Sequence, residues 1–172
     1  EMCIRDRIVA VNQIIDEASA REIIKVFTEV VIAPGLTEGA RKIFSSKSNL
    51  RLLTTEGVTD LAHSSKVIRH VTGGYLLQDK DVEPASKNNF RVVTKRSPTD
   101  NEFKDMLFAW KVAKHVKSNA IVYARNRSTV GIGAGQMSRV DSCRIAAKKS
   151  EDMAKIQGLD ELPTRGSAVA SD

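Results

Sequence analysis

Two polar side chains in the second half of the chain stand where they could bind a ligand. Asn119 lies between a predicted helix and a predicted strand. Its amide donates and accepts hydrogen bonds at once, which suits a carboxamide or formyl group. Arg139 lies in the first turn of a predicted helix, where the helix dipole and free N–H groups favour a negative or electron-rich group. The commoner interpretation of such an asparagine is a turn residue that bonds its own backbone.

Three glycines two residues apart, Gly131, Gly133 and Gly135, lead into the helix that carries Arg139. Glycine lets a backbone approach a ligand without obstruction by Cβ. The spacing matches neither the GxGxxG pattern of dinucleotide-binding sites nor the P-loop, so we infer neither NAD nor ATP. On spacing alone, tight packing at the end of a hairpin is the favoured explanation.

Other residues with reactive side chains have simpler interpretations. Glu29 precedes a predicted strand, and a carboxylate there can hold a ribose diol, although a solvated glutamate is more frequent. Cys143 is interpreted as a small packed residue rather than a nucleophile, and His115 as the end of a helix. The histidines are scattered singly without a metal-binding spacing, so we do not expect a zinc hydrolase.

The elements that position these residues alternate between strand and helix in the first third of the chain. This order favours an α/β layer with parallel strand pairing. On the first helix, Ala20, Ile23, Ile24 and Phe27 share one face. We expect strands at residues 8–12, 30–33, 50–54 and 90–94, helices at 16–27 and after Thr37, and short extended pieces near 67–68 and 75–77.

A second group of elements follows the Ser97-Pro98 break. Thr99 and Glu102 fit a capping box, which predicts the start of a helix. An apolar stripe on that helix is expected to pack in the core. We then expect strands at 120–124 and 129–132 joined by a turn, and a helix from about 138 to 157 ended by Gly158. The stripe consists of Phe103, Met106, Leu107, Trp110, Ala113 and Val116.

Composition narrows the class of protein. Of the 172 residues, 41% are hydrophobic, which is enough for a core, but no run is long enough to span a bilayer. Two distant cysteines exclude a disulfide scaffold and favour a reducing cytosol. The net charge is +6, and residues 114–149 contain eight basic residues and one acidic residue. This bias favours an anionic partner, or else a solvated basic face.

Longer strings of residues resemble a known family. KSNAIVYA at 117–124 and TVGIGAGQMSRVDS at 129–142 resemble the AICAR transformylase half of the AICAR transformylase/IMP cyclohydrolase family. The resemblance extends over residues 8–172, nearly the whole chain. The further matching segments, in order, are IVAVN at 8–12, EVVIAP at 29–34, RVVTKR at 91–96 and ASD at 170–172.

The resemblance implies an α/β fold of mixed sheets with flanking helices, built from cytidine-deaminase-like subdomains and truncated at both ends. Residues 1–7 are expected to be a non-native junction, 8–96 part of the first transformylase subdomain and 97–172 part of the second. The family transfers a formyl group from 10-formyltetrahydrofolate to AICAR ribotide in purine (IMP) biosynthesis. It implies a cytoplasmic homodimer with its site at the subunit interface, no nucleic-acid or membrane partner, and a parent protein that is also an IMP cyclohydrolase.

By motif position, the resemblance assigns Glu29, Asn119 and Arg139 to the AICAR nucleotide and Val140 to the folate. It implies that Asn119 orients the carboxamide or formyl oxygen. It also implies that Arg139 fixes the nucleotide by charge-assisted hydrogen bonds. The residues expected to support the loop are Lys117, Ser118, Gly133, Gly135 and Gln136.

The resemblance also implies a cation site within the chain and a catalytic pair outside it. Segments around Ser118 and Asp172 resemble those that line a monovalent-cation site, with potassium as the expected ion. The family's catalytic Lys-His pair lies upstream of this segment, so we expect no catalytic residue here. We therefore expect the 172-residue chain alone to be inactive in formyl transfer.

Two other classes of protein compete with this interpretation. A small nucleic-acid-binding module is suggested by the isoelectric point of about 9.4 and the basic 114–149 stretch. Aromatic residues make up only 5% of the chain, and Tyr123 is the one tyrosine in that stretch, which leaves little surface for base stacking. The third class is a structural fragment that self-associates through an exposed half-core.

Overall fold

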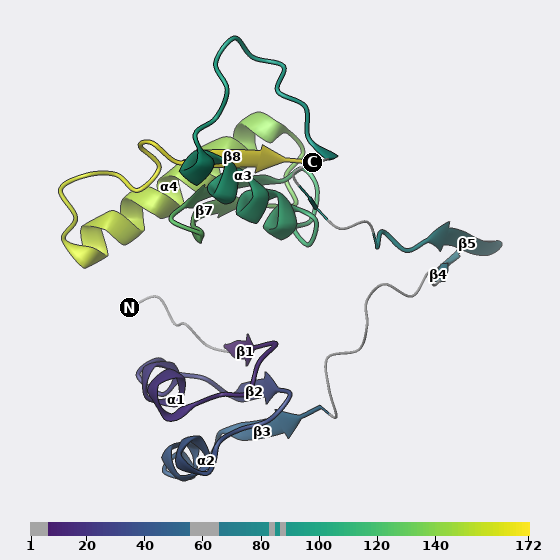
Figure 1. Cartoon of the computed structure of the whole chain (residues 1–172). Coiled ribbons are helices and arrows are strands. Elements are labelled where there is room, and N and C mark those ends of the chain that lie inside the picture. The colour runs from purple at the N-terminus through teal and green to yellow at the C-terminus, as the bar shows by residue number, and fades with distance from the viewer. Residues whose placement is uncertain (1–6, 56–65, 83–84, 87–88) are drawn as a thin grey trace. The chain divides into compact units, whose positions relative to one another are not determined.

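The computed structural model describes residues 7–55, 66–82, 85–86 and 89–172 (Figure 1). The chain forms two compact units, residues 1–82 and 83–172. Helices and several small sheets occur in both parallel and antiparallel arrangements, which confirms the expected mixed α/β class. The subdomain boundary between residues 96 and 97 stays a prediction about the parent protein, and the expected junction at residues 1–7 lies almost entirely outside the described residues.

The first unit contains a parallel sheet with both of its helices on one face. Strands β1 (Ile8–Ala10), β2 (Val30–Ala33) and β3 (Arg51–Thr54) pair in parallel in the order β1-β2-β3. Helices α1 (Glu17–Ile23) and α2 (Glu38–Phe44) connect consecutive strands. The parallel layer expected from the alternation of elements is therefore confirmed.

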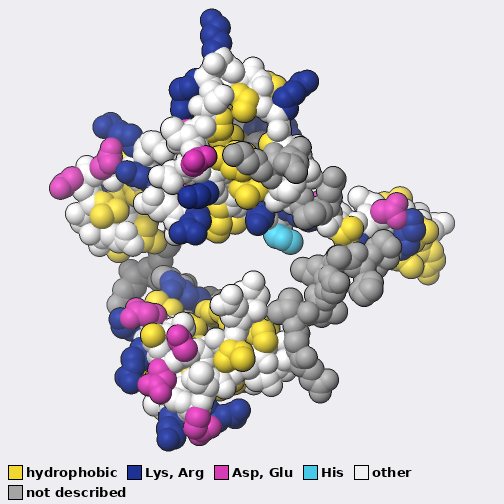
Figure 2. Space-filling model, viewed as in Figure 1, with side chains coloured by type: hydrophobic (Ala, Val, Ile, Leu, Met, Phe, Trp, Pro, Cys, Tyr) yellow, Lys and Arg dark blue, Asp and Glu magenta, His cyan; other side chains and the backbone are white. Residues whose placement is uncertain are grey.

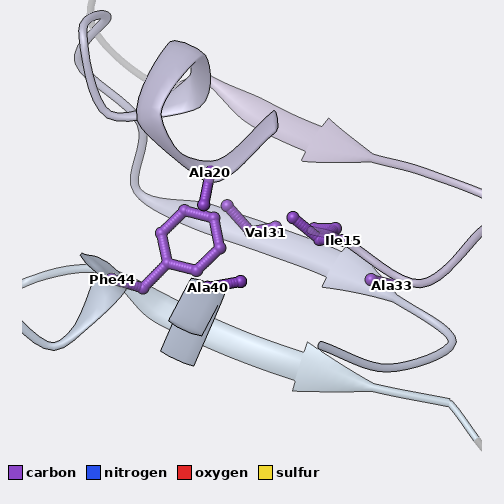
Figure 3. Close-up of a cluster of buried hydrophobic side chains, with 6 residues drawn as sticks. All are labelled: Ile15, Ala20, Val31, Ala33, Ala40 and Phe44. Atoms are coloured by element: carbon purple, nitrogen blue, oxygen red, sulfur yellow. The ribbon is translucent and has the colours of Figure 1, made fainter. Parts of the chain in front are cut away.

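The core of this sheet is filled by small residues around one aromatic ring. Figure 3 shows Phe44 of α2 lying between Ala20 of α1 and Ala40, with Val31 of β2 beside it. Because residues alternate sides along a strand, Val31 and Ala33 are buried while their neighbours face away. The buried set is Ile15, Ala20, Val31, Ala33, Ala40 and Phe44.

Helix α1 is shorter than predicted. It begins as expected after Asp16, whose carboxylate accepts the N–H of Ser19 at 2.8 Å. It ends at Ile23 because the next N–H groups, of Lys25 and Val26, bond three residues back, which tightens the last turn. The expectation that Phe27 shares the buried face is wrong, since that side chain is 60% exposed.

A hairpin forms from the two extended pieces expected after the first sheet. Strands β4 (Lys66–Val71) and β5 (Gly74–Asp79) pair antiparallel and are exposed along nearly their whole length. Gly73, with φ of 87°, supplies the left-handed backbone of the turn.

The strand predicted at residues 90–94 is wrong. This segment belongs to no sheet, because no strand of the described residues lies beside it to take its backbone hydrogen bonds. The Phe90 ring instead packs edge-on against Phe103 and Trp110, with ring centroids 6.0 and 5.8 Å apart.

The second unit is an antiparallel sheet between two helices (Figure 1). Strands β6 (Ile121–Arg125), β7 (Ser128–Gly133) and β8 (Ala168–Ser171) lie in the order β7-β6-β8. Helix α3 (Asp100–Ala113) packs on β6 and β8, and α4 (Arg139–Gln157) packs mainly on β7. The buried residues on the α3 side are Ala109, Ala113, Val122, Ala124 and Ala170.

The predicted start of α3 is confirmed in detail. Glu102 N–H donates to the Thr99 hydroxyl at 3.3 Å, and the Thr99 N–H donates to the Glu102 carboxylate at 2.8 Å. Arg96 donates two hydrogen bonds to the same carboxylate, at 2.7 and 3.0 Å. The Arg96 bonds and then the Thr99 N–H lower the pKa of Glu102 to about 2.

The apolar stripe of α3 is buried only in part, which corrects the prediction. Ala113 lies in the core and Val116 packs against it, but Met106 is 43% and Trp110 48% exposed. These two side chains line an apolar groove of about 550 Å³ beside β8 and residues 90–98. Helical spacing shows which residues share a face, and it does not show whether anything covers that face.

Helix α4 and the hairpin before it follow the predictions. Ser138 caps α4 by accepting the Asp141 N–H at 3.1 Å, and Gly158 closes it with φ of 63°. The β6–β7 turn places Asn126 and Arg127 at φ of 54° and 57°, as a two-residue hairpin loop requires.

In the described ranges, no helix combines the length and the apolar character needed to cross a bilayer. The same residues contain no group of three or more His, Cys, Asp or Glu side chains arranged to hold a metal ion.

Candidate functional site

Four segments of the second unit meet at one end of its sheet. They are residues 117–120 before β6, residues 134–138 after β7, the first turn of α4, and the end of β8 at Ser171 and Asp172. Hydrogen bonds connect all four segments. Asn119 and Arg139, singled out from the sequence, therefore lie in one connected cluster, termed the polar cluster below.

Asn119 is held in place through both its backbone and its side chain. Its N–H and its side-chain Nδ2 donate to the carbonyl of Gln136, at 3.3 and 2.9 Å. The Ser142 hydroxyl of α4 donates to the Asn119 carbonyl at 2.6 Å. Since Nδ2 must face a carbonyl, Oδ1 is fixed on the other side, and no described residue bonds it. That oxygen can accept an N–H from a ligand.

The loop after β7 is bonded to the segment before β6. The Gly135 N–H donates to the Lys117 carbonyl at 2.8 Å, and the Gln136 side chain donates to the Ala134 carbonyl at 3.0 Å. Gly135 has φ of 66°, a conformation that favours glycine. The peptide bond between Ser118 and Asn119 is cis. Lys117, Ser118, Gly135 and Gln136 thus belong to the polar cluster.

Arg139 binds the end of β8 by its side chain. Its Nη2 donates to the Asp172 carbonyl at 2.8 Å, and its Nε lies 3.2 Å from both that carbonyl and the Ser171 hydroxyl. The Nη1 group has no partner among the described residues, and the side chain is 56% exposed. An anchored guanidinium with a free edge can bind an anion or a polar ring.

The carboxylate of Asp172 connects the two sides of the polar cluster. Its Oδ1 accepts the Ala120 N–H at 2.9 Å and lies 3.7 Å from Arg139 Nη2. The Ser118 hydrogen bond, followed by the Ala120 N–H and the charge of Arg139, lowers the pKa of Asp172. The carboxylate is therefore ionised at neutral pH and partly balances the charge of Arg139.

Two of the three glycines serve packing and not ligand approach. A Cβ atom at Gly131 would collide with the carbonyl oxygen of Ala146, and one at Gly133 with that of Ser142. Both carbonyls belong to α4, so the glycines allow the helix to lie directly on β7. This outcome agrees with the structural explanation that the spacing favoured.

Val140 and Glu29 complete the residues assigned by motif. Val140 follows Arg139 in the first turn of α4 and is 58% exposed. Glu29 belongs to the first unit, where its backbone bonds to Arg7 and Arg51. Glu29 lines an open pocket of about 790 Å³ with residues 24–28 and 46–51.

Sequence reasoning did not single out two serines that hold the polar cluster together. Ser142 bonds the Asn119 carbonyl, and Ser171 bonds Arg139. No local pattern marks either role, since both bonds join segments that are far apart in the sequence. Cys143, interpreted as a packed residue, contacts the hydroxyl of Tyr123 at 2.9 Å, and this contact followed by burial raises the pKa of Tyr123 to about 12.

Comparison with known proteins gives consistent matches. A family model described as "AICARFT/IMPCHase bienzyme" matches residues 3–149. "Bifunctional purine biosynthesis protein PurH" of Roseobacter denitrificans is 56% identical over 165 residues, covering 96% of this chain and 31% of the relative. Relatives of the same name in Cereibacter sphaeroides and Brucella anthropi are 58% and 55% identical, with the same coverage. The chain thus spans 31% of the length of these relatives.

Proposed function

The chain belongs to the AICARFT/IMPCHase bienzyme family, and from this we propose that it forms part of the AICAR transformylase half of such a protein. The proposed reaction transfers a formyl group from 10-formyltetrahydrofolate to the amine of AICAR ribotide, in purine biosynthesis. The observation that supports it most directly is the polar cluster, in which Asn119 and Arg139 each keep a polar group that no described residue bonds.

In this proposal, Asn119 and Arg139 bind the AICAR ribotide. The free Oδ1 of Asn119 accepts an N–H of the ligand's carboxamide, and the free Nη1 edge of Arg139 donates to the nucleotide. Both side chains are already oriented by hydrogen bonds within the chain. Their geometry therefore need not be established at the moment of binding, which favours affinity and orientation.

The chemistry also requires groups that we propose to lie outside this segment. The AICAR amine is a weak nucleophile because its lone pair delocalises into the ring and the carboxamide. The reaction needs a proton acceptor and a group that stabilises the oxyanion on the formyl carbon. We propose that the family's Lys-His pair, expected upstream, provides these functions, and that the described residues bind and orient.

The roles of Glu29 and Val140 stay proposals. Glu29 would hold the ribose through its carboxylate, and Val140 would contact the folate through an exposed apolar side chain.

We also propose that the fold is built from cytidine-deaminase-like subdomains, since in the second unit a β7-β6-β8 sheet lies between two helices. We further propose that the parent protein is a cytoplasmic homodimer. The comparisons do not support the nucleic-acid alternative. On the face shown in Figure 2, Lys and Arg side chains stand in small groups among apolar ones.

A potassium site near Ser118 and Asp172 is a further proposal. The carboxylate and the hydroxyl are oxygen donors of the kind that hard cations prefer. Arg139 lies 3.7 Å from Oδ1 of Asp172, so a cation would bind on the side of the carboxylate that faces away from the guanidinium. In a full-length family protein that carries this segment, we expect formyl transfer to fall when potassium is replaced by tetramethylammonium. An unchanged rate would contradict the site.

The proposed function is tested by a formyl-transfer assay with AICAR ribotide and 10-formyltetrahydrofolate. The proteins compared are the 172-residue chain and a full-length family protein that carries this segment. We expect product from the full-length protein and none from the chain alone, because the catalytic pair is expected outside it. No product from the full-length protein would contradict the proposed function, and product from the chain alone would contradict the assignment of catalysis to the missing segments.

A further inference from the structure

A buried serine of α4 contacts the backbone of one of the two residues that the proposed function assigns to the ribotide. Ser142 is 0% exposed, and its hydroxyl donates to the Asn119 carbonyl at 2.6 Å. A serine inside a helix commonly bonds the carbonyl four residues back in the same helix. Here the hydroxyl donates to another segment instead, so the bond connects α4 to residues 117–120.

The packing of α4 on the sheet brings this hydroxyl within reach of its acceptor. Gly133 of β7 pairs with Ile121 of β6, which lies two residues after Asn119. A Cβ atom at Gly133 would collide with the backbone of Ser142, so the absent side chain is what lets α4 lie directly on β7 at this point. The close approach of helix and strand therefore sets the distance between Ser142 and Asn119.

The bond from Ser142 closes a ring of contacts around the polar cluster. Ser142 lies three residues after Arg139, so the two are neighbours on the surface of α4. Arg139 donates to the Asp172 carbonyl at 2.8 Å, and the Asp172 carboxylate accepts the Ala120 N–H at 2.9 Å. Ala120 directly follows Asn119, whose carbonyl accepts the Ser142 hydroxyl. The amide and the guanidinium are thus connected on one side through β8 and on the other through Ser142.

We propose that Ser142 is a positioning residue, one that holds Asn119 at the distance from Arg139 that the ribotide requires. This inference rests on the proposed function. Ser142 is fully buried and acts through the Asn119 carbonyl, which belongs to the residue whose amide binds the ligand. Without this bond, Asn119 keeps its bonds to the Gln136 carbonyl but loses its connection to the helix that carries Arg139.

The test uses a full-length family protein that carries this segment, with S142A, S142C and the matched control S150A. Ser150 is 1% exposed, also packs on β7, and lies about 12 Å further along α4. No described residue bonds its hydroxyl, so S150A removes an equally buried hydroxyl without removing a hydrogen bond. Dissociation constants for AICAR ribotide and for tetrahydrofolate are measured separately by titration calorimetry, and S142A is also measured in an N119A background.

We expect S142A to weaken ribotide binding about fivefold, a factor that corresponds to about 1 kcal/mol, because Asn119 loses one of the bonds that orient it. S142C places a thiol, a weak donor, at the same position and should weaken ribotide binding about twofold. Tetrahydrofolate affinity stays within about twofold in all variants, as does the ribotide affinity of S150A. In the N119A background, S142A adds less than about twofold, since no amide remains to be positioned.

Ribotide affinity equal to that of the parent in both S142A and S142C would overturn the inference. An equal loss in S150A, an equal loss of tetrahydrofolate affinity, or the same fivefold loss in the N119A background would also overturn it, because each indicates a general structural effect.

The two proposals fail separately. If the parent protein binds the ribotide but forms no formylated product, the proposed reaction is wrong and the ribotide affinity of S142A still decides the role of Ser142. If the parent protein binds no ribotide, both are wrong.

Discussion

The two ends of the sheet in the second unit each hold a carboxylate on backbone N–H groups, but the side chains beside the two carboxylates differ. At the hairpin end, Asp105 of α3 accepts the N–H groups of Asn126 and Arg127 at 3.0 and 2.7 Å. At the other end, Asp172 accepts the Ala120 N–H and lies near Arg139.

The difference lies in what surrounds each carboxylate. The Asp105 bonds satisfy a tight turn, and we find no reason there to expect a ligand. Beside Asp172, the side chains of Asn119 and Arg139 are oriented by hydrogen bonds, and each still has one acceptor or donor that is unbonded within the described part of the chain. A carboxylate that accepts backbone N–H groups therefore does not by itself indicate a binding site. Beside Asp172 the indication is that an amide and a guanidinium are held in one hydrogen-bonded cluster.

The largest expected effect is a loss of stability at Gly133, where α4 packs directly on β7 beside the polar cluster. Gly133→Ala places a Cβ against the Ser142 carbonyl, which belongs to the helix backbone and cannot move alone. We expect a loss of about 3 kcal/mol or more in unfolding free energy, measured by urea denaturation. At Gly135 a Cβ would make only an ordinary contact, 3.7 Å from the Lys117 side chain, but the backbone is left-handed, so Gly135→Ala should cost only about 1 kcal/mol. Equal losses would contradict the packing explanation.

Asp172→Ala tests the polar end of the sheet directly. Removal of the carboxylate leaves the Ala120 N–H without its acceptor and removes the ion pair that helps to orient Arg139. We expect AICAR ribotide to bind about tenfold more weakly in a full-length family protein with this change, as measured by titration calorimetry. A ribotide affinity equal to that of the parent would remove Asp172 from the binding site.

Asp105→Ala is the matched change at the hairpin end. It leaves two backbone N–H groups of the turn without their acceptor, so we expect about 1 kcal/mol lower stability. Ribotide affinity should stay the same, because the turn lies at the opposite end of β6 from Asn119. A loss of affinity comparable with that of Asp172→Ala would show that the two ends are not independent.

A third carboxylate that accepts a backbone N–H, that of Glu102, can be tested through the pH dependence of stability. Its folded pKa of about 2 lies below its ordinary value of 4.5, so its ionised form stabilises the fold above about pH 4.5. That stabilisation is lost as the pH falls from about 4.5 towards 2. The melting temperature of the parent chain should therefore exceed that of E102Q at neutral pH, and the difference should disappear near pH 2. A difference independent of pH would contradict the ionic origin.

The smallest effect is a gain in stability. Arg127 has a left-handed backbone with φ of 57°, which costs a non-glycine residue free energy. Arg127→Gly keeps the N–H that Asp105 accepts and should stabilise the chain by about 0.5 to 1 kcal/mol. Thermal unfolding measures this gain. A loss would show that the Arg127 side chain contributes contacts that outweigh the backbone strain.

Local chemistry made several element ends predictable from the sequence. Thr99, Ser138 and Gly158 mark the caps of α3 and α4 because each satisfies backbone groups within a few residues. The strand at 90–94 failed because a strand depends on a partner elsewhere in the chain. The exposure of Trp110 was not predictable for the same reason, since periodicity defines a face and not its cover.

Several residues of the polar cluster were predictable from the sequence, but its connections were not. The resemblance singled out Asn119 and Arg139, whereas no local pattern connects Ala120 with Asp172, which lies 52 residues away. That contact depends on the pairing of β6 with β8. Ser142 and Ser171 were missed because a serine acquires such a role only from the tertiary fold.

The central claim is that Asn119 and Arg139 bind the same ligand molecule. It is tested most directly by titrating AICAR ribotide into a full-length family protein that carries this segment, and into its N119A, R139A and double variants. We expect each single change to weaken binding at least about tenfold, and the double change to weaken it by less than the product of the two. Unchanged ribotide affinity in N119A and R139A would contradict the account.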